Sequence, residues 1–154
     1  MLNVVIDFDG VLHNYQKWDG IDVINDGPIK KCLDAATDYL DTKLTVNIFS
    51  SRSREPEGIA AIKKALIDWG YERLAREALF PDHKVPAMVY IDDRGLTCNG
   101  SLPDAELVKT FVPWNKWHTL NKNRLTKQYA LRMADLERQR AELTALYERI
   151  LLDE

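Results

Sequence analysis

An α/β fold built on a parallel sheet is predicted by three features of this sequence. Apolar runs rich in β-branched residues at 4–6, 44–49 and 87–91 have the composition of buried strands. Segments with apolar residues at helical spacing separate these runs, and two of the runs lead into acidic residues. Because strands that alternate with helices are joined by right-handed crossovers, we expect a three-layer, Rossmann-like parallel sheet.

The composition limits the class of protein. The chain has 154 residues, a net charge of -3 and a pI near 5.7, which argues against a strongly basic protein that wraps nucleic acid. No apolar run approaches the roughly 20 residues that span a bilayer, and the N-terminus lacks the layout of a signal peptide. We therefore expect a cytoplasmic protein that does not bind membranes.

The first strand ends in two carboxylates. The apolar run 4–6 is followed by Asp7 and Asp9, which point to the same side of an extended strand. Two adjacent carboxylates repel each other, and a divalent cation would relieve that repulsion. Gly10 lets the backbone turn closely beneath whatever the acids bind. The alternative is a strand that ends in an ordinary Asp-Gly turn.

The next segments alternate between helix and strand. Residues 13–27 are polar and aromatic by turns, and we expect a short hairpin or flap over the end of the first strand. Pro28 opens a helix, 44–49 forms the second strand, and Pro56 opens another helix that Gly70 ends. The helix that follows Pro28 should pack on the sheet.

Shorter elements are predicted in the second half of the chain. Residues 79–80 are expected to form a short strand, and 87–91 the strand that leads into the second pair of acids. We expect a short extra strand and turn at 96–100, a short helix at 103–109 and an edge strand at 110–112.

The C-terminal segment, residues 115–154, is expected to form one long helix with a single apolar stripe that Arg140 interrupts. The stripe consists of Leu125, Tyr129, Met133, Leu136, Leu143, Tyr147 and Ile150. Such a face must cover its own domain, a second copy of the chain or another partner. We expect two domains, 1–114 and 115–154, and a homodimer formed through the helix.

Four short motifs carry the chemistry. In chain order they are Asp7-Phe8-Asp9-Gly10-Val11, Ser50-Ser51-Arg52, Lys84 and Ile91-Asp92-Asp93-Arg94. The carboxyl ends of parallel strands meet at one edge of a sheet, so the acids of the first and last motifs should converge there. This set resembles the haloacid dehalogenase (HAD) superfamily of Mg²⁺-dependent phosphotransferases, over roughly residues 1–112.

The resemblance implies a HAD-like fold and a phosphatase that acts through an aspartyl-phosphate intermediate. Asp7 would attack phosphorus, and Asp9 would protonate the leaving oxygen and later activate the hydrolytic water. Lys84 would offset the negative charge of the nucleophile and the phosphate. An acid two positions after the nucleophile favours an ester substrate over a carbon–halogen bond.

The resemblance also implies a Mg²⁺ site. Asp7, the backbone oxygen of Phe8, and Asp92 or Asp93 would hold the ion, whereas the backbone oxygen of Asp9 is not expected to take part. The family pattern often reads Gly-Asp where this chain has two aspartates in succession. Which of the two lies nearer to the metal is therefore left open.

The serine motif would bind the substrate phosphate. Ser50 would donate a hydrogen bond to a phosphate oxygen, the Ser51 backbone amide would help, and Arg52 is a candidate substrate contact. The alternatives are a helix N-cap or turn for the two serines, a salt bridge for Arg52 and a solvated surface charge for Lys84.

The expected substrate is a phosphomonoester. Neither gap between motifs holds the large cap domain that many members of this superfamily insert, so an open site should admit a nucleotide or the phosphorylated end of a nucleic acid. His13, Tyr15 and Trp18 in the flap would stack on a base or pack within the flap itself.

Basic residues at the start of the terminal helix fit a nucleic acid, and a solvated helix face explains them more simply. They are Lys116, Lys122, Arg124, Lys127 and Arg132. The runner-up function is a non-catalytic interaction module of the same fold, whose acids bind a metal for stability and whose long helix docks a partner.

Overall fold

A computed structural model describes residues 2–96, 102–103 and 105–152. The chain forms two compact units, Met1–Asp93 and Arg94–Glu154. Residues 94–114, which are expected to belong to the first domain, cluster with the second unit, because helix α4 (Ala105–Thr110) contacts helix α5 (Lys122–Leu152). The division between the units therefore does not coincide with the expected boundary after residue 114.

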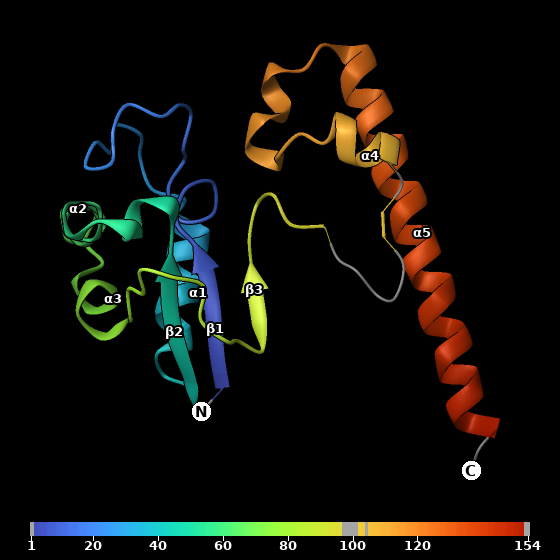
Figure 1. The fold of residues 1–154 in the computed structure, drawn as a ribbon, viewed down its shortest axis with the longest axis horizontal. Coiled ribbons are helices and arrows are strands. Elements are labelled where there is room, and N and C mark those ends of the chain that lie inside the picture. Colours follow the sequence, from blue (N-terminus) through green and yellow to red (C-terminus); the bar gives the residue numbers. More distant parts are fainter. Residues whose placement is uncertain (1, 97–101, 104, 153–154) are drawn as a thin grey trace. The chain divides into compact units, whose positions relative to one another are not determined.

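The first unit is built on a three-stranded parallel sheet, as the sequence predicts. Its strands are β1 (Leu2–Asp7), β2 (Leu44–Phe49) and β3 (Val89–Ile91), in the order β2-β1-β3 (Figure 1). In the register of the sheet, Asp7 lies opposite Phe49, and Ile6 lies opposite Ile91. The chain that leaves β3 therefore starts beside the last residue of β1.

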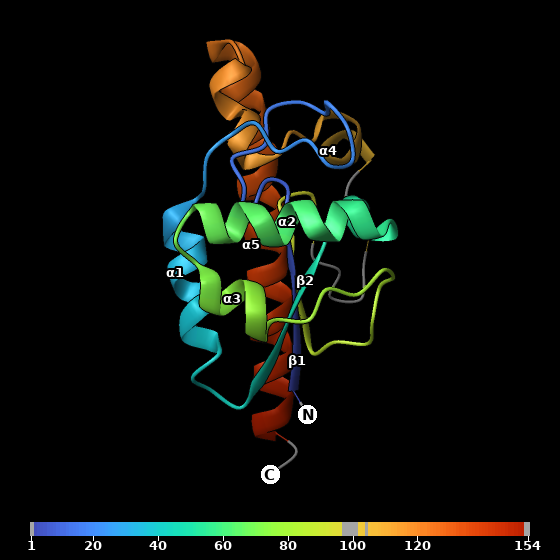
Figure 2. The ribbon, with the colours of Figure 1, turned by 90° about the vertical axis from the view of Figure 1, so that its left-hand side faces the viewer.

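Three helices pack in this unit with the sheet. They are α1 (Lys30–Tyr39), α2 (Pro56–Asp68) and α3 (Glu72–Glu77), and Figure 2 shows them together with β1 and β2. A single core joins the elements through fully buried residues such as Ile48 of β2, Leu33 of α1, Ile62 of α2 and Leu74 of α3. The two helices that open near Pro28 and at Pro56 are confirmed; α3 is an additional element.

Residues 14–27 form a flap without any strand, so the hairpin form of the expectation is wrong. The ends of the flap are tied by the Asn14 amide, which donates to the Gly27 carbonyl at 2.9 Å. Inside it, the carbonyls of Gly20, Ile21 and Val23 accept hydrogen bonds from the Arg52 side chain. A guanidinium thus takes the acceptors that a partner strand would have used.

Two of the shorter predicted elements differ from expectation. Leu79 makes only an isolated bridge to Asn47, not a strand. The edge strand at 110–112 is wrong because Thr110 ends α4, where its hydroxyl donates to the Glu106 carbonyl. The strand and turn expected at 96–100 fall mainly on residues outside those described.

The second unit contains the short helix α4, the 3₁₀ turn η2 (Trp114–Thr119) and the long helix α5, which confirms a long C-terminal helix. The side chain of Asn121 caps α5, since its Oδ1 accepts from the Arg124 amide at 2.9 Å. None of the described helices is both long and apolar enough to cross a lipid bilayer.

Candidate functional site

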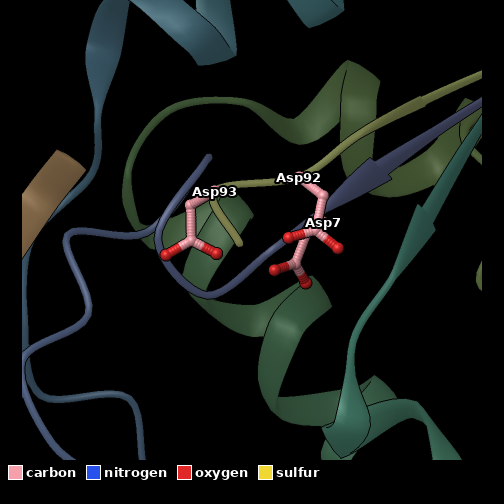
Figure 3. A group of neighbouring side chains, drawn as sticks. All are labelled: Asp7, Asp92 and Asp93. Atoms are coloured by element: carbon pink, nitrogen blue, oxygen red, sulfur yellow. The ribbon is translucent and has the colours of Figure 1, made fainter. Parts of the chain in front are cut away.

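The structure brings three of the predicted acids together. Asp7 ends β1, and Asp92 and Asp93 follow β3 directly. Carboxylate oxygens of the three residues all lie within 4.8 Å of one another, and Figure 3 shows the side chains gathered at this end of the sheet. We call these three residues the acid cluster. Asp92 is exposed, Asp7 is half-buried and Asp93 is buried, so the cluster lies at the surface with one side inside the protein.

The charge of the acid cluster is unfavourable without a counter-ion. Burial, together with the negative charges of Asp92 and Asp93, raises the pKa of Asp7 to about 8. A hydrogen bond of 2.8 Å from the Phe8 amide to Asp7 Oδ1 acts against this shift but does not cancel it. Asp7 therefore holds a proton at neutral pH unless positive charge enters the cluster.

Gly10 fits closely beneath the acid cluster. Its φ angle is 101°, a left-handed conformation that side chains rarely adopt. A Cβ atom on Gly10 would lie 2.4 Å from Oδ2 of Asp93, too close for any real contact. Only glycine therefore lets the turn after β1 pass under the Asp93 carboxylate, as the sequence predicts for the chain beneath the acids.

Asp9 belongs to a different group from Asp7. Its Oδ2 accepts from Ser50 Oγ at 3.0 Å and from Arg52 Nε at 2.9 Å, and its Oδ1 lies 2.9 Å from His13 Nδ1. We call these four residues the Asp9 clamp. Although burial opposes the effect, the hydrogen bonds from His13, Arg52 and Ser50 and the Arg52 charge lower the pKa of Asp9.

Arg52 lies in the interior of the first unit. Its side chain is 1% exposed, pairs with Asp9, and donates through Nη1 to the Gly20 carbonyl at 2.6 Å and the Val23 carbonyl at 2.9 Å. The guanidinium carbon also lies 4.6 Å from the centre of the Trp18 ring. The salt-bridge alternative for Arg52 is thus what the structure shows, and the side chain joins the flap to Asp9.

The serines after β2 occupy different environments. Ser50 is buried and caps the 3₁₀ turn η1 (Ser51–Arg54), because its hydroxyl oxygen accepts from the Arg52 amide at 3.2 Å. Ser51 is exposed at the start of the same turn. Gly58 allows the turn to pack against α2, since a Cβ there would lie 2.0 Å from the Arg52 carbonyl oxygen.

The backbone oxygen of Phe8 is already used within the turn that follows β1. It accepts hydrogen bonds from the Leu12 amide at 3.0 Å and the His13 amide at 2.9 Å. These two bonds occupy both of its lone pairs, so the structure gives no support to Phe8 as a metal ligand. The expectation that the Asp9 backbone oxygen takes no part in the metal site stays a prediction.

Lys84 lies against an aromatic ring. Its ammonium is 4.2 Å from the centre of the Tyr90 ring, and the Tyr90 hydroxyl donates to the Val85 carbonyl. Nearby, Asn3 Nδ2 donates to the Pro86 carbonyl at 3.1 Å, at the end of β1 remote from Asp7. Among the described residues, no acid forms an ion pair with Lys84, and its catalytic role stays a prediction.

The flap aromatics are divided between the core and the surface. His13 is 1% exposed and packs beside Phe8 and Trp69, with ring centres 5.4 and 5.9 Å away, and the Phe8 and Trp69 rings lie 6.0 Å from each other. Trp18 is half-exposed on the flap. Packing therefore explains His13, whose link to Asp9 depends on a tight turn that sequence pattern does not reveal.

Comparison of the chain with protein-family models, with curated proteins and with solved structures gives no match. The acid cluster and the Asp9 clamp are therefore interpreted from their own geometry.

Proposed function

We propose that this protein is a divalent-cation-dependent phosphomonoesterase of the HAD type, with a three-layer Rossmann-like first domain. The observation that carries the proposal is the acid cluster, in which Asp7, Asp92 and Asp93 converge from two strand ends. Phosphoryl transfer requires a nucleophile and positive charge held together, and a carboxylate that shares a cation with two neighbours meets both needs.

The residues of the acid cluster fit Mg²⁺. All three offer carboxylate oxygens, the donors that hard divalent cations prefer, and no His or Cys belongs to the group. Burial and the repulsion of Asp92 and Asp93 together raise the pKa of Asp7 to about 8, and a bound divalent charge would offset both effects. A bound ion would supply charge neutralisation for the transferring phosphoryl group.

The cation also determines the state of the nucleophile. A protonated Asp7 has no free charge with which to attack phosphorus, so the metal-free protein should be inactive near neutral pH. Attack by the ionised Asp7 oxygen forms an aspartyl-phosphate bond as the ester oxygen leaves with a proton. A water molecule then attacks phosphorus, restoring the carboxylate and releasing phosphate.

Asp9 is proposed to move the protons in both steps. Its low pKa suits the second step, in which a carboxylate accepts a proton from water. In the first step it must carry a proton, and the negative charge of a bound phosphate ester would raise its pKa towards that state. The buried partners Arg52 and His13 would position Asp9 and would not contact the substrate.

Hydrolysis of an aryl phosphate with and without Mg²⁺ tests the proposal. The parent protein should hydrolyse the ester only with the cation, and Asp7→Asn should lose activity on the order of a thousandfold or more. Asp22→Asn, which changes an exposed acid of the flap, is the matched control and should stay active. Equal activity of Asp7→Asn and the parent would overturn the assignment of the nucleophile.

A non-catalytic interaction module is the second candidate, and one observation favours it. The side chains of Ser50 and Arg52 already form hydrogen bonds within the protein, so these two motif residues have structural roles. In that case a panel of nucleotides, sugar phosphates and phosphorylated oligonucleotides would show no hydrolysis. Mg²⁺ would still stabilise the parent protein but not Asp7→Asn.

We also propose that α5 forms a homodimer. Tyr129, Leu136, Leu143 and Ile150 recur every seven residues, and each side chain is more than half exposed. A strict seven-residue repeat is the pattern by which two identical helices pair. The mass in solution should be twice the 17.7 kDa of the chain and fall to one chain in Leu143→Glu but not in Thr144→Glu. A monomeric parent would contradict this proposal.

A further inference from the structure

A small cavity lies in the second unit beside the beginning of α5. Its volume is about 170 Å³. The lining residues come from the end of α4, the chain around η2 and the first two turns of α5 (Figure 1): Thr110, Val112, Leu120, Arg124, Lys127 and Gln128. The cavity belongs to neither the acid cluster nor the Asp9 clamp, and two of its lining residues, Arg124 and Lys127, are among the basic residues that fit a nucleic acid.

Gln128 is the most unusual residue in the lining. Its side chain is only 2% exposed, and its Nε2 is buried with no hydrogen-bond partner among the described residues. A buried amide group that lacks its partner costs roughly 1 to 3 kcal/mol. Because an amide nitrogen can only donate, the missing partner must be a hydrogen-bond acceptor.

The charges beside Gln128 favour an anionic acceptor. Arg124 and Lys127 also line the cavity, and with Gln128 they occupy positions i, i+3 and i+4 on one face of α5. Lys127 Nζ is 2.6 Å from Oε1 of Glu106, the one acid paired with these cations among the described residues. The two cations exceed that acid by one positive charge, and the N-terminus of a long helix adds positive potential.

We propose that this cavity binds a phosphate group. Gln128 Nε2 would donate to one phosphate oxygen, while Arg124 and Lys127 would balance the charge of the others. A tetrahedral oxyanion suits three donors that project from successive positions of one helix face, because its oxygens point in several directions. The group can be free inorganic phosphate or a phosphate of a nucleotide chain, and both present the same oxygens.

The side-chain amide signal of Gln128 in NMR spectra of the full chain provides a local readout. The signal is assigned by its disappearance in Gln128→Leu. Inorganic phosphate is titrated at constant ionic strength with a chelator present, so that the acid cluster holds no cation and repels phosphate. We expect a saturable shift of the Gln128 amide signal.

Two variants separate the cavity from general surface charge. Arg124→Gln should weaken phosphate binding about tenfold, the effect of losing one charge-assisted contact. Arg149→Gln, an exposed arginine near the other end of the same helix, should leave it unchanged. If Gln128→Leu fails to fold, the assignment is made by backbone connectivity and Arg124→Gln carries the test.

A single-stranded oligonucleotide titrated in the same way distinguishes the two sources. Binding at least tenfold tighter than free phosphate, with affinity falling as salt rises, would identify a nucleotide chain as the ligand. Equal or weaker binding would identify the free anion. Absence of a saturable Gln128 shift with both ligands, or equal binding by Arg124→Gln and the parent, would overturn the proposal and leave water as the occupant.

Discussion

Asp7, the last residue of β1, and Asp9, two residues further on, have surroundings that shift their pKa values in opposite directions. Asp7 lies with two other acids, and burial together with their repulsion raises its pKa to about 8. Asp9 lies with Arg52, His13 and Ser50, whose hydrogen bonds lower its pKa. The protein thus supplies the counter-charge of Asp9 itself, whereas Asp7 must obtain its counter-charge from a proton or a cation.

The largest expected effect comes from removing the counter-charge of Asp9. Arg52→Met keeps much of the side-chain volume but leaves a mostly buried carboxylate and three flap carbonyls without their donor. We expect a loss of about 3 to 5 kcal/mol in the free energy of unfolding, measured by urea denaturation. Arg54→Met, an exposed arginine of the same turn, should change it by no more than about 0.5 kcal/mol. Similar losses in the two variants would show that Arg52 is not the partner on which Asp9 depends.

Replacing each of the two aspartates by asparagine should change the free energy of unfolding in opposite directions. Asp9→Asn removes the charge that Arg52 and His13 face, and should destabilise the metal-free protein by about 3 kcal/mol at pH 7. Asp7→Asn replaces a buried carboxyl, which the metal-free folded state must keep protonated at pH 7, by a neutral amide, and should stabilise the metal-free protein by about 1 to 2 kcal/mol. Urea denaturation in a chelator measures both values. Destabilisation by Asp7→Asn would mean that the acid cluster is not under electrostatic stress.

Gly10→Ala tests the packing beneath the acid cluster. The added Cβ would be strained at a φ of 101° and would displace the Asp93 carboxylate. We expect a loss of about 2 kcal/mol in stability and weaker stabilisation of the protein by Mg²⁺. Gly27→Ala, where a Cβ meets no atom within 4 Å, is the matched control and should change neither measurement. If Mg²⁺ stabilised Gly10→Ala as much as the parent, the close packing of Gly10 beneath the acid cluster would not be needed for cation binding.

Per pH unit, the smallest expected effect is the dependence of stability on pH. The folded-state pKa of Asp7 lies above its unfolded value of 3.8, so between about pH 4 and 8 the folded state keeps a proton that the unfolded state has lost. Stability should therefore fall as pH rises through this window, by at most about 1.4 kcal/mol per pH unit. The slope is measured as the difference between the parent and Asp7→Asn. Saturating Mg²⁺ should remove the difference, and a persistent slope would contradict a shared cation site.

The convergence of the acids could be predicted from the sequence because it depends on strand ends. Two apolar runs that lead into aspartates place them at one edge of a parallel sheet, and the register of Ile6 with Ile91 brings Asp7 beside Asp92. The hydrogen bonds of the Phe8 backbone oxygen and of the Arg52 side chain could not be predicted. Their backbone and guanidinium contacts depend on how the turn and the flap close, and neither leaves a periodic pattern in the sequence.

Lys84 illustrates a different limit of prediction. A short motif fixes the order of residues along the chain, but the loop before β3 decides which way the side chain turns, and here it turns to the Tyr90 ring. The flap does not form a hairpin for a related reason. Its carbonyls accept hydrogen bonds from the buried Arg52 guanidinium instead of from a partner strand. Neither the contact of Lys84 with the Tyr90 ring nor that of Arg52 with the flap carbonyls can be predicted from local secondary-structure propensity.

The double duty of Arg52 has a mechanical consequence. The Arg52 guanidinium binds the flap carbonyls and the Asp9 carboxylate at the same time. The flap therefore cannot move outward without weakening the contact between Arg52 and Asp9. Energetic coupling between two such events is reciprocal. Protonation of Asp9 must therefore also favour opening of the flap, and any contact that holds the flap closed must make Asp9 a stronger acid.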